Sequence, residues 1–212
     1  MTSYDHFIRL LVLIGFLIGG LLLTTLVSGL LMLASGMSLA DIMKMAQSGM
    51  GALSPGLTRG LLATQHLLIF ILPGLLFGLV FYQGKFLNGL NLDVHPGWQL
   101  SILGIFFLMA AYPLVNLSFL ANESIPLPAW ADKFESQAED TLKAILTMNT
   151  PVIFIFNLII IAILPGIGEE LIFRGILQKH IGLLFKSPVA AIWIAAFIFS
   201  AIHLQFEGFL PR

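Results

Sequence analysis

Residues 10–34 read LLVLIGFLIGGLLLTTLVSGLLMLA and contain no charged side chain over 25 positions. About 20 consecutive apolar residues are enough for a helix to cross a hydrocarbon core of roughly 30 Å. The stretch is too long for the apolar core of a secretory signal, which has about 7–15 residues. It therefore predicts an uncleaved transmembrane helix near the N-terminus.

The composition of the whole chain is that of a membrane protein. Of its 212 residues, 58% are hydrophobic and 10% are charged, whereas a soluble domain has about 25% charged residues. The mean hydropathy is +0.98. The formal net charge of −1 leaves no basic excess for a nucleic-acid backbone, so no nucleic-acid partner is expected. The absence of cysteine excludes disulfides, thiolate nucleophiles and Cys-ligated metal sites.

Four further apolar stretches predict additional membrane spans. We expect these spans at about 60–82, 100–120, 151–185 and 188–206. The helix over 151–185 is expected to break near Pro165, because proline lacks the N–H that continues a helix. Residues 129–147 carry apolar side chains at three- and four-residue spacing among charged ones, which predicts a helix on the membrane surface. The predicted fold class is all-α: a polytopic helical membrane bundle with amphipathic interfacial helices, forming one domain over residues 1–212.

The most informative segment lies in the fourth span, where residues 165–174 read PGIGEELIFR. Three unpaired charges facing lipid would cost about 7–10 kcal/mol, so Glu169, Glu170 and Arg174 are expected to be shielded from lipid. Glu170 and Arg174 lie four residues apart and can pair on one helix face, so a structural ion pair is the simpler interpretation of these two. Glu169 lies about 100° round the helix from Glu170 and is left without a local cation.

A second pattern occurs in the fifth span, where Phe199 and His203 lie four residues apart on one helix face. Histidine is the side chain best suited to moving a proton near neutral pH. If Glu169 and His203 face each other, they can deprotonate a water between them, and a positioned base contributes about 10²–10⁴ in rate. The alternative is that His203 only hydrogen-bonds a neighbouring carbonyl.

The remaining polar groups have simpler interpretations. Gln65 and His66 in the second span are expected to form interhelical hydrogen bonds. Glu207 is expected to be an interfacial charge rather than a metal ligand. The other histidines lie at helix ends or in loops and are assigned no role: His6, His95 and His180.

The pair of motifs Glu169-Glu170-x-x-x-Arg174 and Phe199-x-x-x-His203 resembles the first two motifs of the CPBP family. These are the CAAX-processing and bacteriocin-processing intramembrane proteases, which include type II CAAX prenyl endopeptidases. The resemblance covers about residues 157–212 and implies an intramembrane endopeptidase that cuts a membrane-associated protein or peptide. It implies that Glu169 activates the hydrolytic water and that His203 orients or deprotonates it. Glu170, Arg174 and Phe199 would then support the site.

The resemblance leaves the cofactor open. A divalent metal such as zinc, with Glu169, Glu170 and His203 as candidate ligands, and a metal-independent glutamate mechanism are both compatible with the family. The third family motif, a histidine followed four residues later by asparagine or aspartate, does not occur after His203. We therefore expect a shortened form without the C-terminal helices of the family. Little protease activity is expected from it, because one oxyanion donor is worth about 10²–10³ in turnover.

Two other functions are compatible with the same residues. One is a non-catalytic immunity or scaffold relative that binds a peptide or a partner protein. The other is a proton-coupled transporter that uses the buried glutamate and histidine as a relay. The expected surroundings are the lipid bilayer of a prokaryotic inner membrane, which the chain crosses several times.

Overall fold

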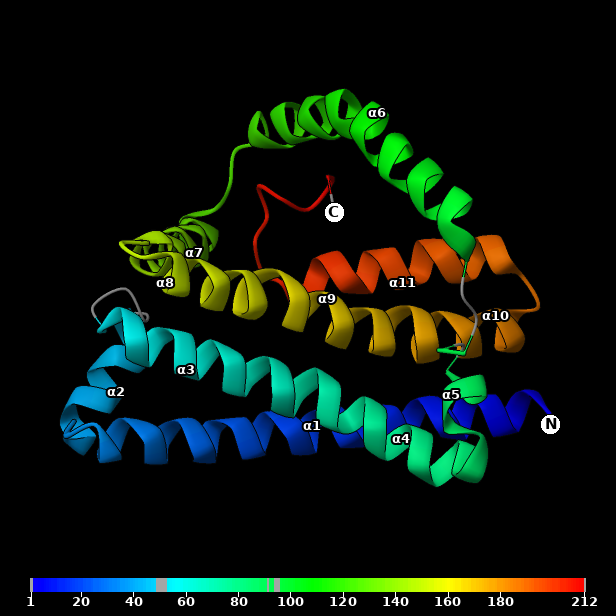
Figure 1. Cartoon of the computed structure of the whole chain (residues 1–212), viewed down its shortest axis with the longest axis horizontal. Helices are drawn as coiled ribbons and strands as arrows, with labels where there is room; N and C mark the ends of the chain where they lie inside the picture. Colours follow the sequence, from blue (N-terminus) through cyan, green and yellow to red (C-terminus); the bar gives the residue numbers. More distant parts are fainter. Residues whose placement is uncertain (1, 49–52, 91, 94–95, 212) are drawn as a thin grey trace.

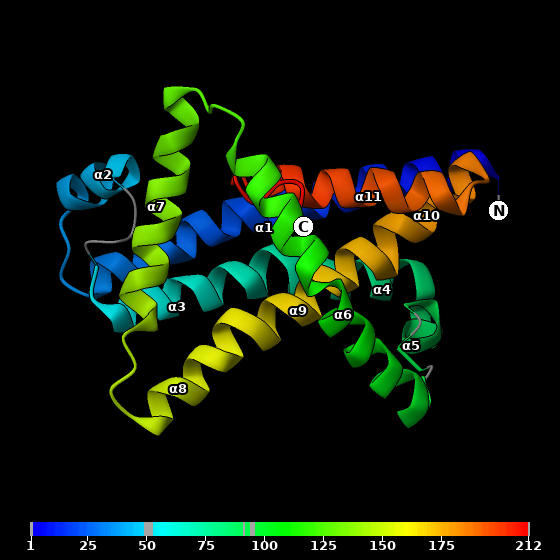
Figure 2. The same ribbon diagram turned by 90° about the horizontal axis from the view of Figure 1, so that it is seen from above.

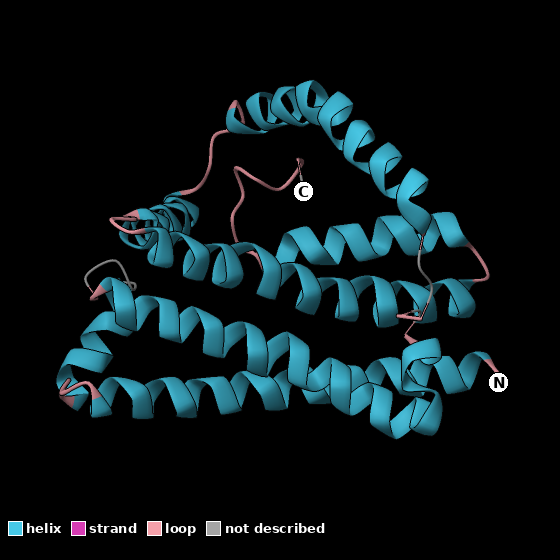
Figure 3. Cartoon of the chain, viewed as in Figure 1, coloured by secondary structure: helices cyan, strands magenta, loops and turns pink. Residues whose placement is uncertain are grey.

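The computed structural model describes residues 2–48, 53–90, 92–93 and 96–211, and its elements are helices (Figures 1 and 3). Four helices are long and apolar enough to cross a membrane: Ser3–Ala34, Pro55–Tyr82, Gly97–Glu123 and Pro151–Phe185. Over the described ranges no strand is formed, which confirms the all-α class. His95 lies outside the described residues.

The long helices divide into segments of different pitch. Helix α1 is Ser3–Ala34 and α6 is Gly97–Glu123. The second long helix joins α3 (Pro55–His66), the π-helical segment η2 (Leu67–Ile71) and α4 (Leu72–Tyr82). The fourth joins α8 (Pro151–Asn157), the π-helical η4 (Leu158–Ile163), α9 (Leu164–Glu169), the π-helical η5 (Glu170–Gln178) and α10 (Lys179–Phe185). The shorter elements are α2 (Leu39–Ser48), η3 (Gln83–Lys85), α5 (Phe86–Gly89), α7 (Ala129–Leu146) and α11 (Pro188–Ile202).

The fourth long helix does not end at Pro165, in contrast to the expected break. It continues from Pro151 to Phe185. The π-helical segment η4 ends directly before α9, in whose first turn Pro165 lies. The wider π turn shifts the pattern of backbone hydrogen bonds by one residue. Pro165, which has no N–H to donate, lies where this pattern is already interrupted, so the helix can continue past it. The same arrangement occurs in the second long helix, where η2 precedes Pro73.

The core lies where α1 and the second and fourth long helices pack together (Figures 1 and 2). Its fully buried side chains include Leu13, Phe77, Ile172 and Ile176. The fourth helix packs tightly against η2 at Gly168, where an added Cβ would lie 2.9 Å from the Cβ of Phe70. A glycine is therefore needed directly before Glu169, and this contact holds that glutamate beside the second helix.

Helix α6 has a different environment from the other long helices. It arches away from them in Figure 1, and none of its most apolar window is buried. Asn122, near the C-terminal end of α6, is buried and donates a hydrogen bond to the carbonyl of Phe206. The apolar surface of α6 suits a lipid environment, since a helix satisfies its own backbone groups there.

Helix α7 covers the residues expected to form a surface helix, and a part-buried polar network joins its C-terminal end to the bundle. Arg59 of α3 donates to Asn157 Oδ1 at 2.7 Å and to the carbonyls of Ile145 and Thr147 at 3.0 and 3.2 Å. Asn157 donates to the carbonyl of Ile145 at 2.5 Å. A guanidinium at a helix C-terminus satisfies carbonyls that have no partner in the helix. The network therefore fixes α7 across the ends of α3 and α8.

We predict that Arg59→Gln loosens α7 and lowers the free energy of unfolding by about 2–3 kcal/mol, because a charged donor to three acceptors is lost. Unfolding in detergent micelles and the rate of chymotrypsin cleavage at Trp130 and Phe134 of α7 measure the two effects. The control is Lys143→Gln, which removes an exposed pair with Glu139 and should leave both quantities unchanged. Wild-type unfolding and wild-type cleavage in Arg59→Gln would contradict the anchoring role.

Candidate active site

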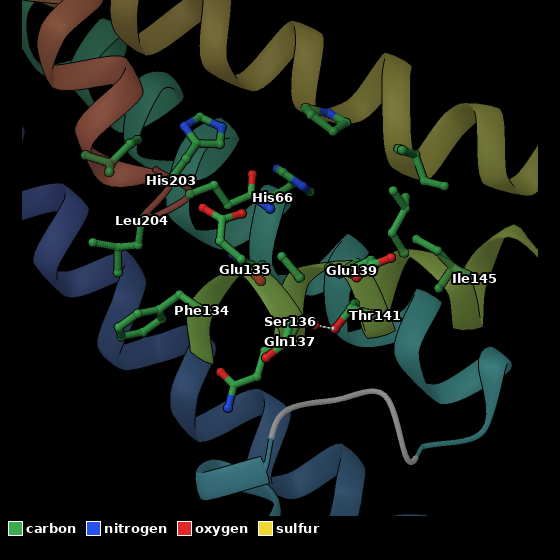
Figure 4. Close-up of a pocket in the computed structure, with 18 of the residues that line it drawn as sticks. His66, Phe134, Glu135, Ser136, Gln137, Glu139, Thr141, Ile145, His203 and Leu204 are labelled. Atoms are coloured by element: carbon green, nitrogen blue, oxygen red, sulfur yellow. Dashed lines mark hydrogen bonds between the residues drawn. The ribbon is translucent and has the colours of Figure 1, made fainter. Parts of the chain in front are cut away.

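A cavity of about 1210 Å³ lies between the second long helix, α7, the fourth long helix and the end of α11 (Figure 4). Gln65 and His66 line it from α3, and Glu169 lines it from α9. His203 closes another side from the C-cap of α11. The side formed by α7 is acidic and polar, with Asp132, Glu135, Ser136, Glu139 and Thr141. The cavity is thus bounded by apolar bundle helices and by the amphipathic surface helix.

Glu169 and His203 meet on the cavity wall. The distance from Glu169 Oε1 to His203 Nε2 is 3.9 Å, and their side chains are 19% and 26% exposed. His203 Nδ1 is 2.7 Å from the carbonyl oxygen of Phe199. Because a carbonyl only accepts, Nδ1 carries the hydrogen, and in the neutral ring Nε2 keeps its lone pair. The histidine therefore presents a proton acceptor toward the glutamate and the cavity.

The separation of the two groups suits a bridging water. A distance of 3.9 Å is too long for a direct hydrogen bond between Nε2 and Oε1. A water that makes bonds of about 2.8 Å to both atoms would have an angle of roughly 90° between them, which lies within the range of water-mediated contacts. The geometry can therefore place one water on two acceptors at once.

Phe199 holds the imidazole from one side. Its ring lies 4.8 Å from the His203 ring and 5.1 Å from the ring of Phe173, at interplanar angles of 62° and 84°. Edge-to-face contacts of this kind orient aromatic rings. Through its carbonyl and its ring, Phe199 thus sets both the tautomer and the orientation of His203.

Glu170 and Arg174 form the expected ion pair, with 3.2 Å between Glu170 Oε2 and Arg174 Nη1. The two side chains are 55% and 74% exposed, so the bundle does not bury them. Neither residue lines the cavity. Their own pairing, rather than burial, neutralises the two charges, and this separates Glu170 from Glu169 although the two are adjacent in sequence.

The described residues do not fit a zinc site. Zinc in a catalytic site is held by three protein ligands of the His, Cys, Asp or Glu type. Across the described ranges, no three such residues converge in a way that could hold a metal ion. Of the three candidate ligands, Glu169 and His203 lie together and Glu170 is turned toward Arg174. Only two of the three candidate ligands therefore lie close to each other.

His66 is the site residue that the sequence did not reveal. Instead of bonding another helix, it lies on the cavity wall, stacked on Phe70 with 5.9 Å between the ring centroids. Figure 4 shows its ring beside the cavity together with His203.

The Nδ1 atom of His66 is buried and has no hydrogen-bond partner. A buried N–H without an acceptor is rarer than a buried acceptor without a donor, so the proton of the neutral ring belongs on Nε2. Only a tertiary contact distinguishes this histidine from one that joins two helices.

Glu207 lies in the segment after α11 and also lines the cavity. Its backbone N–H donates to Glu135 Oε1 at 3.1 Å. Partial burial, and then repulsion from Glu135 and Glu123, raises the pKa of the Glu207 carboxyl above its ordinary value of 4.5. Glu207 therefore lies at the acidic side of the cavity. Its backbone hydrogen bond keeps it close to other carboxylates, which repel its own charge.

We predict that Glu207→Gln raises the melting temperature at pH 7 but not at pH 4. A carboxyl whose pKa is raised in the folded state costs stability when ionised, and this cost disappears as the pH falls below the unfolded value. Melting curves of the variant and wild type at the two pH values measure the effect. Equal melting temperatures at both pH values would show that the neighbouring carboxylates do not destabilise Glu207.

Residues 151–211 match the family model described as type II CAAX prenyl endopeptidase Rce1-like. The matched region begins with α8 and includes Glu169 and His203, so the resemblance indicated by the two motifs is confirmed. No curated protein and no solved structure matches the chain. The matched family is one of membrane-embedded proteases. Together with four helices long enough to span a bilayer, the match identifies an integral membrane protein.

Proposed function

We propose that this protein, with its Rce1-like region at residues 151–211, is an intramembrane endopeptidase that hydrolyses a peptide bond of a membrane-associated protein or peptide. The observation that supports this most directly is the 3.9 Å approach of Glu169 Oε1 and His203 Nε2. Both groups line a cavity of about 1210 Å³, which has room for several residues of an extended peptide. A carboxylate and an imidazole on one water are the minimal machinery for metal-independent hydrolysis.

In this proposal Glu169 is the general base. Its carboxylate takes a proton from the water, and His203 Nε2 accepts the second hydrogen bond of that water and orients it. The water oxygen attacks the carbonyl carbon of the scissile peptide bond and forms a tetrahedral intermediate. The C–N bond then breaks, and the proton held by Glu169 passes to the leaving amine. The Phe199 carbonyl keeps the His203 lone pair on the cavity side throughout these steps.

We infer that His66 supplies a hydrogen bond to the oxygen of the scissile carbonyl. Its Nε2–H is free to point into the cavity because Nδ1 is enclosed by protein. A donor aimed at the developing oxyanion stabilises the transition state more than the substrate. A neutral imidazole is sufficient for this role, and its stacking on Phe70 holds the ring in place.

We predict that Glu169→Gln lowers the single-turnover rate of peptide cleavage at least about 10³-fold while the protein remains folded, since glutamine cannot accept a proton. The assay follows a membrane-anchored peptide in proteoliposomes for hours, so that a slow wild-type rate is still detected. Glu123→Gln at the end of α6, which does not line the cavity, is the matched control and should cleave at the wild-type rate. Cleavage at the wild-type rate in Glu169→Gln would remove Glu169 from the mechanism. Peptide binding without any cleavage by the wild type would instead favour the non-catalytic binding relative.

We predict that His66→Phe lowers kcat about 10²-fold with little change in KM, as expected for a donor used mainly in the transition state. His66→Gln keeps a side-chain N–H and should recover part of the loss. The two variants are compared in the same proteoliposome assay, with melting temperature as the test of folding. Equal kcat for His66→Phe and wild type would remove His66 from the mechanism without affecting the roles of Glu169 and His203.

A further inference from the structure

A second polar cluster lies at the opposite end of the bundle from α7. Figure 1 shows the N-terminus of α1, the end of α4, α5 and α10 together at this end. Tyr82, the last residue of α4, is at the centre of the cluster. The guanidinium carbon of Arg9 lies 5.7 Å from the centroid of the Tyr82 ring, and Lys179 Nζ lies 5.1 Å from it. We call Arg9, Tyr82 and Lys179 the Tyr82 cluster.

The neutral polar groups of this region are satisfied within the protein. His6 and His180 lie near the starts of α1 and α10, as expected, and they are 7% and 1% exposed. Their Nδ1 atoms are 2.9 Å apart, which requires a hydrogen on one ring and a lone pair on the other. His180 Nε2 lies 3.3 Å from the hydroxyl of Tyr82. This series of hydrogen bonds joins α1, α10 and α4. It uses both ring nitrogens of His180, so neither is left to bind a ligand.

The two cations of the Tyr82 cluster have no such compensation. Lys179 donates to the carbonyl of Gly89 at 2.6 Å, and Arg9 lies over the rings of Phe81 and Tyr82. Within the described part of the chain, no carboxylate pairs with either cation. Cation–π contacts and one carbonyl orient the two groups but do not cancel their charge. Two positive charges from separate helices are thus held against one aromatic ring.

The surrounding charges favour an anion at this end. Lys85 and Lys186 also lie here, and they are exposed. The only carboxylates in the described segments at this end are Asp5, which bonds Thr2, and Asp93, which bonds Asn88. At the other end, by contrast, α7 and the segment after α11 bring several carboxylates together. The bundle is therefore basic at one end and acidic at the other.

The depth of the cluster matches the phosphate level of a bilayer. Arg9 directly precedes the apolar stretch of 10–34, and Tyr82 ends the second apolar helix. Tyrosine is enriched at the boundary between hydrocarbon and headgroups, and basic pockets between transmembrane helices bind anionic headgroups. Arg9 and Lys179 are half-buried, so a ligand must reach them at the surface of the bundle.

We propose that the Tyr82 cluster binds a phosphate group, supplied by the headgroup of an anionic phospholipid. The planar guanidinium of Arg9 provides paired N–H donors for two phosphate oxygens, and the Lys179 ammonium provides a point charge on the same anion. The bound phosphate would link α1 to α10 at the membrane surface. This site is separate from the cavity, so the proposal does not depend on the protease function.

The test measures binding and stability of the whole chain in detergent with added phosphatidylglycerol, phosphatidylcholine or inorganic phosphate. Phosphatidylglycerol should raise the melting temperature and should be retained in native mass spectra, whereas phosphatidylcholine should do neither. The double variant Arg9→Gln/Lys179→Gln should bind phosphatidylglycerol at least about tenfold more weakly, since it loses both side chains that would contact the phosphate. Lys85→Gln/Lys186→Gln is the matched control, with the same change of charge at the same end. It should weaken binding far less, because these exposed lysines contribute only longer-range attraction.

Each outcome distinguishes the possible ligands. If inorganic phosphate stabilises wild type as well as the lipid does, and the double variant abolishes both effects, the phosphate site is supported and its source is free phosphate. Equal lipid affinity in the double variant and wild type overturns the proposal, as does an equal loss in the Lys85→Gln/Lys186→Gln control. If the double variant does not fold, Arg9→Lys serves in its place. It keeps the charge, loses the paired donors, and should weaken binding measurably.

Discussion

The structure depends on one constraint: a charged side chain in an apolar helix must obtain its compensation from elsewhere in the protein. Water is not available at mid-bilayer, and the backbone of each helix is already satisfied by its own hydrogen bonds. The fourth long helix carries three charges within six residues. The fold accommodates these charges in two ways. Glu170 pairs with Arg174 one turn away. Glu169 lines the cavity beside His203, where water can solvate its carboxylate.

The same constraint explains why the cavity has a surface helix on one side. Helix α7 is too polar to cross the bilayer, and Arg59 ties its C-terminal end to α3 and α8 through backbone carbonyls. A second tie comes from the segment after α11, where the N–H of Glu207 bonds Glu135. The result is a cavity with Glu169 and His203, the proposed catalytic groups, on the bundle side and several carboxylates on the α7 side. A water-requiring reaction and a membrane-anchored substrate can meet at such a boundary.

Much of the fold could be predicted from sequence, since long uncharged stretches and the 3.6-residue periodicity of 129–147 are local signals. Proline at 165 misled the prediction because its effect depends on the preceding turn. A π-helical segment had already shifted the hydrogen-bond ladder there, and no local pattern marks it. His66 and His180 were similarly ambiguous. Each is a single imidazole in or beside an apolar helix, and only its neighbours decide whether it lines a cavity or is buried in the core.

The sequence by itself determined that the chain is a helical membrane protein and that Glu169 and His203 are its chemically unusual groups. Both conclusions follow from composition and spacing along one helix, which are properties of local chain geometry. Only the tertiary structure decided that the two groups stand 3.9 Å apart, that His66 joins them on the cavity wall, and that Glu170 does not. These are relations between helices, which depend on how residues such as Gly168 and Phe70 pack, and packing is a property of the whole bundle.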